Sequence, residues 1–174
     1  MGIQKFHAKP TIMSFRIRIA KENDIKTIFD FICSLADYEK LSFEVTATEE
    51  ILYESLFVKK QAEVLIAELD GTPIGFALFF HNFSTFKGRA CLYLEDLYLQ
   101  PEFRGKGYGK AMFKELAKIA IQRDCDRFDW SVLDWNEPSI KFYKKMGALP
   151  MNEWTVYRLT GEPLRNLAAK SLDR

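Results

Sequence analysis

The sequence has few of the residues that metal sites and disulfide frameworks need. Its 174 residues include only two histidines and three cysteines. Cys33, Cys91 and Cys125 are widely spaced and form no C-x-x-C pair, so neither a zinc ribbon nor a set of disulfides is indicated. His7 and His81 are also far apart. We therefore expect reduced thiols in a cytoplasmic protein and no metal site.

Long apolar runs and an excess of one charge are missing as well. No stretch approaches the roughly 20 apolar residues of a membrane span. The chain carries 25 basic and 24 acidic residues, a net charge of +1, which favours neither a nucleic acid nor an anionic membrane as partner. We expect no nucleic-acid partner and no membrane partner, and the length suits one domain with a substantial core.

The first 14 residues (MGIQKFHAKPTIMS) lack the features of a targeting signal. They contain no continuous apolar core, so they do not resemble a signal peptide. Phe6 stands where a myristoylation signal has Ser or Thr. We expect residues 1–14 to form a flexible extension of a domain at residues 15–174, and Met13 is an alternative start.

The pattern of the remaining chain predicts one mixed α/β domain. Apolar and polar residues alternate from Phe15 in FRIRIA, whereas apolar residues recur at helical spacing from Ile25 to Leu35. Asp70-Gly71 is a typical tight turn, and we expect a largely antiparallel central sheet flanked by helices. Strands are predicted at residues 15–20, 62–69, 73–80, 90–99, 128–133 and 153–159, with a loop at 81–89, and helices at 23–39, 48–57, 107–123 and 136–146, with a helical tail from 161.

The most informative stretch runs from Leu92 to Gly109 (LYLEDLYLQPEFRGKGYG). A predicted strand leads into an arginine and three alternating glycines, and an amphipathic helix follows. Such a turn presents unpaired backbone N–H groups to an anion such as a phosphate. Glu95 and Asp96 interrupt the strand just before the turn, where a charge needs a reason. The stretch therefore predicts an anion-binding loop beside carboxylates.

Two common phosphate-binding motifs do not fit this loop. The dinucleotide-binding G-x-G-x-x-G is one residue longer than the spacing of Gly105, Gly107 and Gly109. A Walker loop needs Ser or Thr after its Gly-Lys pair, but Ala111 follows Lys110. A nucleotide-binding module is therefore not indicated.

The R-G-x-G-x-G pattern does resemble the pyrophosphate loop of the GNAT superfamily of N-acetyltransferases. The predicted order of elements matches the GNAT fold from residue 15 to about 167. LYLED at 92–96, RGKGYG at 104–109 and WNEPSIKFYKKMGA at 135–148 are similar to the diamine acetyltransferase branch, which includes spermidine/spermine and thialysine acetyltransferases.

This resemblance implies acetyl-CoA as cosubstrate. In GNAT enzymes, the strand before the loop splays away from its neighbour and exposes its amides to the pantetheine and the thioester carbonyl. The loop amides and the helix N-terminus then hold the pyrophosphate. The positions that match these cofactor contacts here are Leu97, Tyr98, Leu99, Arg104, Gly105, Lys106, Gly107, Tyr108, Gly109, Asn136, Ser139 and Tyr143.

Two residues are candidates for the proton transfers. Glu95 can accept the proton of the amine, through water, or orient the ammonium group; the alternative is a rim carboxylate paired with an arginine or lysine. Tyr143 resembles the tyrosine that protonates the coenzyme A thiolate, and a phenol with a pKa near 10 suits that role. Its alternative is a core aromatic at helical spacing with Ile140 and Met146.

The acceptor side matches the branch only in part. Tyr38 and Glu39 match a polyamine-contacting pair, and the other candidate substrate contacts are Glu95, Asp96 and Glu153. Polyamine acetyltransferases carry an Asp and a Trp in the loop before LYLED, where this chain has Phe83-Ser84-Thr85-Phe86 followed by Lys87 and Arg89. Because of this departure, a shorter diamine or an amino acid such as thialysine or lysine is at least as good a candidate acceptor as a polyamine.

We therefore expect an N-acetyltransferase that transfers acetyl to a primary amine of a small cationic metabolite by direct attack in a ternary complex. No cysteine has a histidine partner in its sequence context that would suit an acetyl-enzyme. The resemblance also implies a homodimer. Two alternatives stay open, namely a peptide or protein acetyltransferase and a non-catalytic acyl-CoA-binding sensor.

Overall fold

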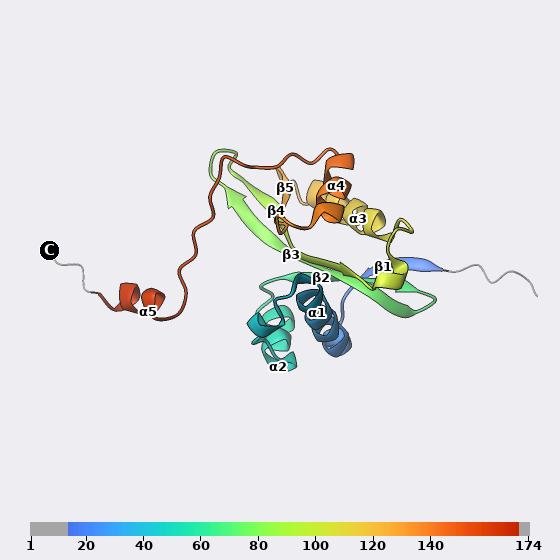
Figure 1. Ribbon diagram of the computed structural model, residues 1–174, viewed down its shortest axis with the longest axis horizontal. Coiled ribbons are helices and arrows are strands. Elements are labelled where there is room, and N and C mark those ends of the chain that lie inside the picture. The colour runs from blue at the N-terminus through green and yellow to red at the C-terminus, as the bar shows by residue number, and fades with distance from the viewer. Residues whose placement is uncertain (1–13, 171–174) are drawn as a thin grey trace, which may run out of the picture. The chain divides into compact units, whose positions relative to one another are not determined.

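The structure is a computed structural model that describes residues 14–170 (Figure 1). The predicted extension and the alternative start at Met13 therefore fall almost entirely outside the described residues. The chain divides into two compact units, with the boundary between Ser131 and Val132.

The first unit contains a mixed, mostly antiparallel sheet of five strands in the order β1-β2-β3-β4-β5. The four antiparallel strands follow one another along the chain, and β5 pairs parallel with β4. Asp70 and Gly71 both have positive φ in the β2–β3 turn, as a two-residue hairpin requires. The strands are β1 (Phe15–Ile19), β2 (Glu63–Leu69), β3 (Thr72–Ser84), β4 (Arg89–Leu99) and β5 (Phe128–Trp130).

Helices cover both faces of this sheet, as predicted (Figure 1). On one face, Ile28 and Phe31 of α1 (Ile25–Glu39) pack against apolar side chains of β2, β3 and β4. On the other face, α3 (Tyr108–Gln122) buries Met112, Phe113 and Leu116. The shorter helical elements are η1 (Glu22–Asp24), η2 (Ser42–Glu44), α2 (Glu49–Tyr53), the π-helical turn η3 (Glu54–Val58) and η4 (Pro101–Phe103).

An ion-pair network fastens the edge strand β1 to β2. Glu68, only 3% exposed, accepts hydrogen bonds from Arg16 and Arg18, and Arg18 also pairs with Asp24 at 2.6 Å. Burial alone raises the pKa of Glu68, but the hydrogen bonds from its two arginines outweigh burial and hold that pKa below its ordinary value. The network therefore stabilises the fold only while its carboxylates are ionised.

The predicted loop at 81–89 is wrong in most of its length. β3 continues to Ser84 and β4 already begins at Arg89, so the two strands form a long hairpin with a tight turn. Gly88 has positive φ in this turn and its N–H bonds to the Ser84 carbonyl at 2.8 Å. The polar residues of this segment suggested a loop. They belong to strand ends of which one face is exposed to solvent.

The second unit contains α4 (Glu137–Lys145) and α5 (Gly161–Ala169). Asn136 caps α4 by accepting a hydrogen bond from the Ser139 N–H at 3.3 Å, and Gly147 has positive φ just beyond the helix. Both ends of this helix were predicted from the Asn-x-Pro start and the glycine stop.

The predicted strand at 153–159 is wrong. The described residues of this segment form no strand, and Trp154, Val156 and Tyr157 are 72%, 85% and 92% exposed. Alternation of side chains sets only which face each residue prefers, whereas a strand also needs a neighbouring strand for its backbone hydrogen bonds. The segment has no such neighbour within residues 14–170.

Candidate active site

Within the first unit, the end of β4 has no strand partner on the side of β5. β5 pairs with β4 only at Leu92, Tyr93 and Leu94, whereas β3 follows β4 up to Leu99. Glu95 is the extra residue of a β-bulge, because Phe79 pairs with Leu94 and the preceding Leu78 pairs with Asp96. β5 ends at Trp130, so β4 has no parallel partner beyond Leu94 in the first unit, and the splayed strand that the resemblance implies stays a prediction.

The backbone N–H groups of Leu97 and Leu99 lie on this edge of β4, which has no strand partner in the first unit. The N–H of Gln100 bonds to the Ile74 carbonyl on β3 at 3.0 Å. Since the N–H groups of successive strand residues turn to alternate sides, the N–H groups of Leu97 and Leu99 turn to the side that β5 has left. The ring of Tyr98 belongs to the core beneath α1. The strand therefore offers backbone donors to a ligand laid beside it.

The glycine loop and the start of α3 continue this edge. Gly105 and Gly107 have φ of 73° and 90°, values that favour glycine. The first helical bond runs from the Ala111 N–H to the Gly107 carbonyl, so the N–H groups of Tyr108, Gly109 and Lys110 are left at the positive end of a 15-residue helix. This arrangement suits a diphosphate.

Glycine is also needed at a position that sequence analysis did not single out. A Cβ at Gly75 would lie 2.3 Å from the Tyr98 carbonyl oxygen and 2.6 Å from Leu99 Cδ2. β3 therefore lies very close to β4 at Tyr98 and Leu99, in the part of β4 that carries the N–H groups described above. An isolated glycine inside an apolar strand pattern was the available signal.

Three of the predicted acceptor contacts are carboxylates that influence one another. Burial raises the pKa of Asp96 to about 6, with further contributions from the negative charges of Glu95 and Glu39. Burial also raises the pKa of Glu39. Glu95 is exposed at the bulge and forms no ion pair with a described residue, which weakens the alternative of a paired rim carboxylate. A cluster of this kind attracts an ammonium group.

The side chain of Arg104 links the loop to two aromatic rings. Its Nε donates to the Leu99 carbonyl at 2.8 Å, and its guanidinium lies 4.7 Å from the ring centroid of Tyr38 and 5.4 Å from that of Tyr98. Lys106 instead lies over the ring of Phe103 at 5.6 Å. Tyr38 thus lies beside Arg104. This contact joins residues far apart in the sequence, so the sequence pattern did not predict it.

The remaining predicted site residues belong to the second unit. Asn136 is 6% exposed and Ser139 donates to it as described, so capping accounts for both. Tyr143 is half-buried on α4 with its ring 5.6 Å from that of Phe142, and Glu153 is exposed. Their contacts with cofactor or substrate stay predictions.

Comparison with known proteins agrees with the geometry of the first unit. Residues 27–148 match the model of the Acetyltransferase (GNAT) family. The chain belongs to the GNAT acetyltransferase family. It is 39% identical to the thialysine N-epsilon-acetyltransferase of Bos taurus over 166 residues, covering 88% of this chain and 97% of the relative. It is 29% identical to an L-ornithine N5-acetyltransferase of Arabidopsis thaliana, covering 88% and 87%.

A solved structure supports the same fold. An integron cassette protein from V. cholerae superposes with a TM-score of 0.76 at 30% identity, covering 91% of this chain and 99% of that protein. The chain is therefore a GNAT-family N-acetyltransferase with a mixed, largely antiparallel sheet flanked by helices, as the sequence predicted.

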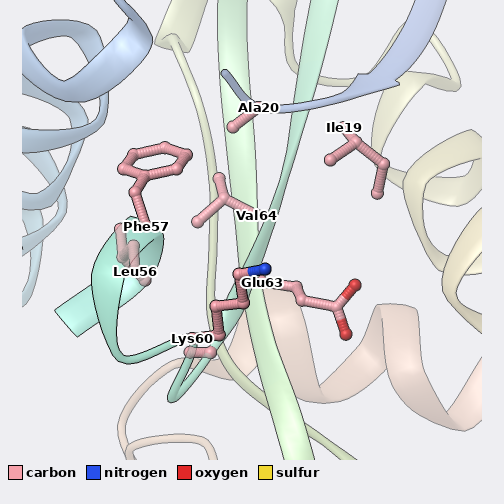
Figure 2. Close-up of a pocket in the computed structure, with 8 residues that line it drawn as sticks. Ile19, Ala20, Leu56, Phe57, Lys60, Glu63 and Val64 are labelled. Atoms are coloured by element: carbon pink, nitrogen blue, oxygen red, sulfur yellow. The ribbon is translucent and has the colours of Figure 1, made fainter. Parts of the chain in front are cut away.

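The acetyltransferase also has a separate hollow of about 350 Å³ beside η3 (Figure 2). Its lining comes from the end of β1, from η3 and from the start of β2, and includes none of the predicted site residues. Glu63 at its rim pairs with Arg123. The lining residues are Ile19, Ala20, Leu56, Phe57, Lys60, Ala62, Glu63 and Val64.

Neither a membrane-spanning helix nor a metal-binding cluster is present in the described part of the enzyme. None of its helices has the length and apolar character needed to cross a membrane. Within residues 14–170, no three histidine, cysteine or acidic side chains are arranged to hold a metal ion.

Proposed function

We propose that this GNAT enzyme transfers the acetyl group of acetyl-CoA to the side-chain amine of a small cationic amino acid such as thialysine or ornithine, or to a short diamine. The observation that carries the proposal is the carboxylate cluster at the β4 bulge, next to a strand edge with unpaired amides. The names of the two relatives support the class of acceptor.

The residues of the first unit fit acetyl-CoA. The N–H groups that begin α3 and the loop glycines suit its diphosphate, and the N–H groups of Leu97 and Leu99 suit its pantetheine arm and thioester carbonyl. Acetyl-CoA supplies the thioester carbon that an amine attacks directly. The proposed binding of acetyl-CoA along this strand edge brings its thioester next to the carboxylates.

The carboxylate cluster serves the acceptor amine. An alkylamine with a pKa near 10 is protonated at neutral pH and must lose a proton before it attacks. Glu39, Glu95 and Asp96 hold the ammonium group, and Glu95 and Asp96 provide the base. A carboxylate whose pKa is about 6, as at Asp96, accepts a proton at neutral pH better than an ordinary aspartate. Tyr143 is the proposed acid for the departing thiolate.

The preference for a short acceptor follows from where the hairpin tip lies. The β3–β4 turn begins at Ser84 and lies six residues of β4 before Glu95, roughly 20 Å along an extended strand. The absent acidic residue at 83–86 would therefore meet only a long polyamine, and a short amine bound at the bulge does not need it.

The test is thiol release from acetyl-CoA with a panel of acceptors at equal concentration, namely thialysine, ornithine, lysine, putrescine, spermidine and a lysine peptide. We expect thialysine or ornithine to give the highest kcat/KM and spermidine a value at least tenfold lower. A preference for the peptide would indicate a protein acetyltransferase. Tight binding of coenzyme A with no acetylation of any acceptor would indicate a sensor.

We also propose that the enzyme is a cytoplasmic homodimer. The resemblance to the diamine branch supports this state, as do the large apolar side chains exposed on the second unit, including Leu149, Trp154 and Tyr157. Size-exclusion chromatography with light scattering should give about twice the chain mass of 20.3 kDa. A monomeric mass at micromolar concentration would refute the dimer.

A further inference from the structure

The side chain of Arg104 makes three directional contacts. One is the hydrogen bond from Nε to the Leu99 carbonyl, and the others are the two rings, Tyr38 at the end of α1 and Tyr98 in β4. A guanidinium is planar and donates through a rigid fork, so it can stack on an aromatic face and bond in its own plane at once. Lysine cannot reproduce this geometry.

These contacts join the two sides of the proposed site. The Arg104 backbone begins the glycine loop, with Gly105 next. The Arg104 side chain donates to the carbonyl of Leu99, in the part of β4 that β5 does not pair with. Tyr38 is followed by Glu39, whose charge acts on Asp96. Arg104 therefore connects the loop of the acyl donor to the helix end that carries an acceptor carboxylate.

We propose that Arg104 is a positioning residue that couples the amine site to the acetyl-CoA loop, and that it does not hold the diphosphate by its charge. The inference rests on the proposed function of the loop and of the carboxylate cluster. The Tyr38–Arg104–Tyr98 stack holds the end of α1 in a fixed position beside β4. Loss of the stack lets Glu39 drift from Asp96, which weakens amine binding and the orientation for attack.

A charge-preserving substitution separates positioning from charge. In Arg104→Lys the positive charge stays, while the stack and the Nε bond are lost. We expect the KM of the amine to rise about tenfold and kcat to fall several-fold, with the Kd of coenzyme A, measured by calorimetry, changed less than twofold. Arg104→Gln should behave like Arg104→Lys. Arg89→Lys, at an exposed arginine paired with Asp124, is the matched control and should leave all three values unchanged.

A double-mutant cycle tests the contact itself. Because Tyr38 and Arg104 share one interaction, the combined loss of kcat/KM in Tyr38→Leu with Arg104→Lys should be about fivefold smaller than the product of the single losses. The control pair is Arg104→Lys with Tyr93→Phe, whose hydroxyl bonds to Ser131 at 2.8 Å, and its losses should multiply. Circular dichroism verifies that each variant is folded.

The outcomes separate this inference from the proposed function. If Arg104→Lys retains the wild-type KM for the amine, the positioning role is refuted. The role is also refuted if coenzyme A binding weakens in Arg104→Gln but not in Arg104→Lys, because Arg104 then binds the diphosphate through its positive charge. Multiplicative losses in the Tyr38 cycle would also refute it. Failure of the wild-type enzyme to bind coenzyme A would instead overturn the proposed function, and this inference with it.

Discussion

Replacement of Asp96 by asparagine should stabilise the protein while it removes activity. Burial and two neighbouring carboxylates make the ionised form of this side chain unfavourable in the fold, and the pKa of Asp96 rises from 3.8 to about 6. A shift of roughly two units corresponds to ~3 kcal/mol of unfavourable free energy once the group is fully ionised, as an upper value. An amide of the same shape carries no such cost.

The pH dependence of this effect has a definite sign. Below about pH 4, Asp96 is protonated in both the folded and the unfolded chain, so the ionisation cost is absent. As the pH rises from 4 to above 6, the unfolded chain releases the proton first and the wild type loses stability. The gain of Asp96→Asn over the wild type should therefore be small at pH 4 and largest at pH 7.5.

Urea unfolding at several pH values measures this difference directly. At pH 7.5 we expect Asp96→Asn to be more stable by ~1–3 kcal/mol, with kcat/KM for the preferred amine reduced about 100-fold. Asp134→Asn, at an exposed position of the second unit, is the control and should change neither quantity. A variant of equal or lower stability at pH 7.5, or a gain that does not depend on pH, would refute the burial argument.

Three further substitutions test other parts of the account. Gly75→Ala places a methyl group 2.3 Å from the Tyr98 carbonyl oxygen. The free energy of unfolding should therefore fall by ~2–3 kcal/mol, and coenzyme A should bind more weakly. An unchanged melting temperature and an unchanged Kd of coenzyme A, both measured by calorimetry, would contradict the close approach of β3 to β4. Glu68→Gln removes the buried negative charge that pairs with two arginines, so the free energy of unfolding should fall by ~3 kcal/mol at pH 7. This difference from the wild type should shrink as the pH falls below the ordinary pKa of glutamate. Equal melting temperatures at pH 7 would show that the ion-pair network contributes nothing to stability. Tyr143→Phe should lower kcat by roughly 100-fold or more with the Kd of coenzyme A unchanged; wild-type turnover would exclude the phenol as the acid.

Local patterns predicted most of the first unit, in which the helices satisfy their own backbone and every strand has a hydrogen-bonded neighbour. The β2–β3 hairpin follows from Asp70-Gly71, and α3 follows from a glycine loop with apolar residues on one face. Residues 153–159 carry an equally good strand pattern, yet form no strand. Pairing depends on a neighbour elsewhere in the chain or in another chain, and a local pattern cannot supply that neighbour.

The sequence suggested a list of candidate site residues but little of their arrangement. The loop was proposed from its R-G-x-G-x-G spacing and the carboxylates of β4 from their place in an apolar strand, and Gly105 and Gly107 have positive φ. The bulge at Glu95, the register that turns the N–H groups of Leu97 and Leu99 away from β3, and the position of Tyr38 beside Arg104 depend on contacts between distant segments. Contacts between segments far apart in the chain cannot be predicted from the short stretch of sequence around either residue.

The central claim is that the carboxylates at the end of β4 select a short amine for acetylation. The most direct test incubates the enzyme with acetyl-CoA and an equimolar mixture of thialysine and spermidine, and measures both acetylated products by mass spectrometry. We expect acetyl-thialysine as the main product, acetylated on its side-chain nitrogen, and loss of this product in Asp96→Asn. Predominant acetyl-spermidine, or product formation that is unaffected by Asp96→Asn, would contradict it.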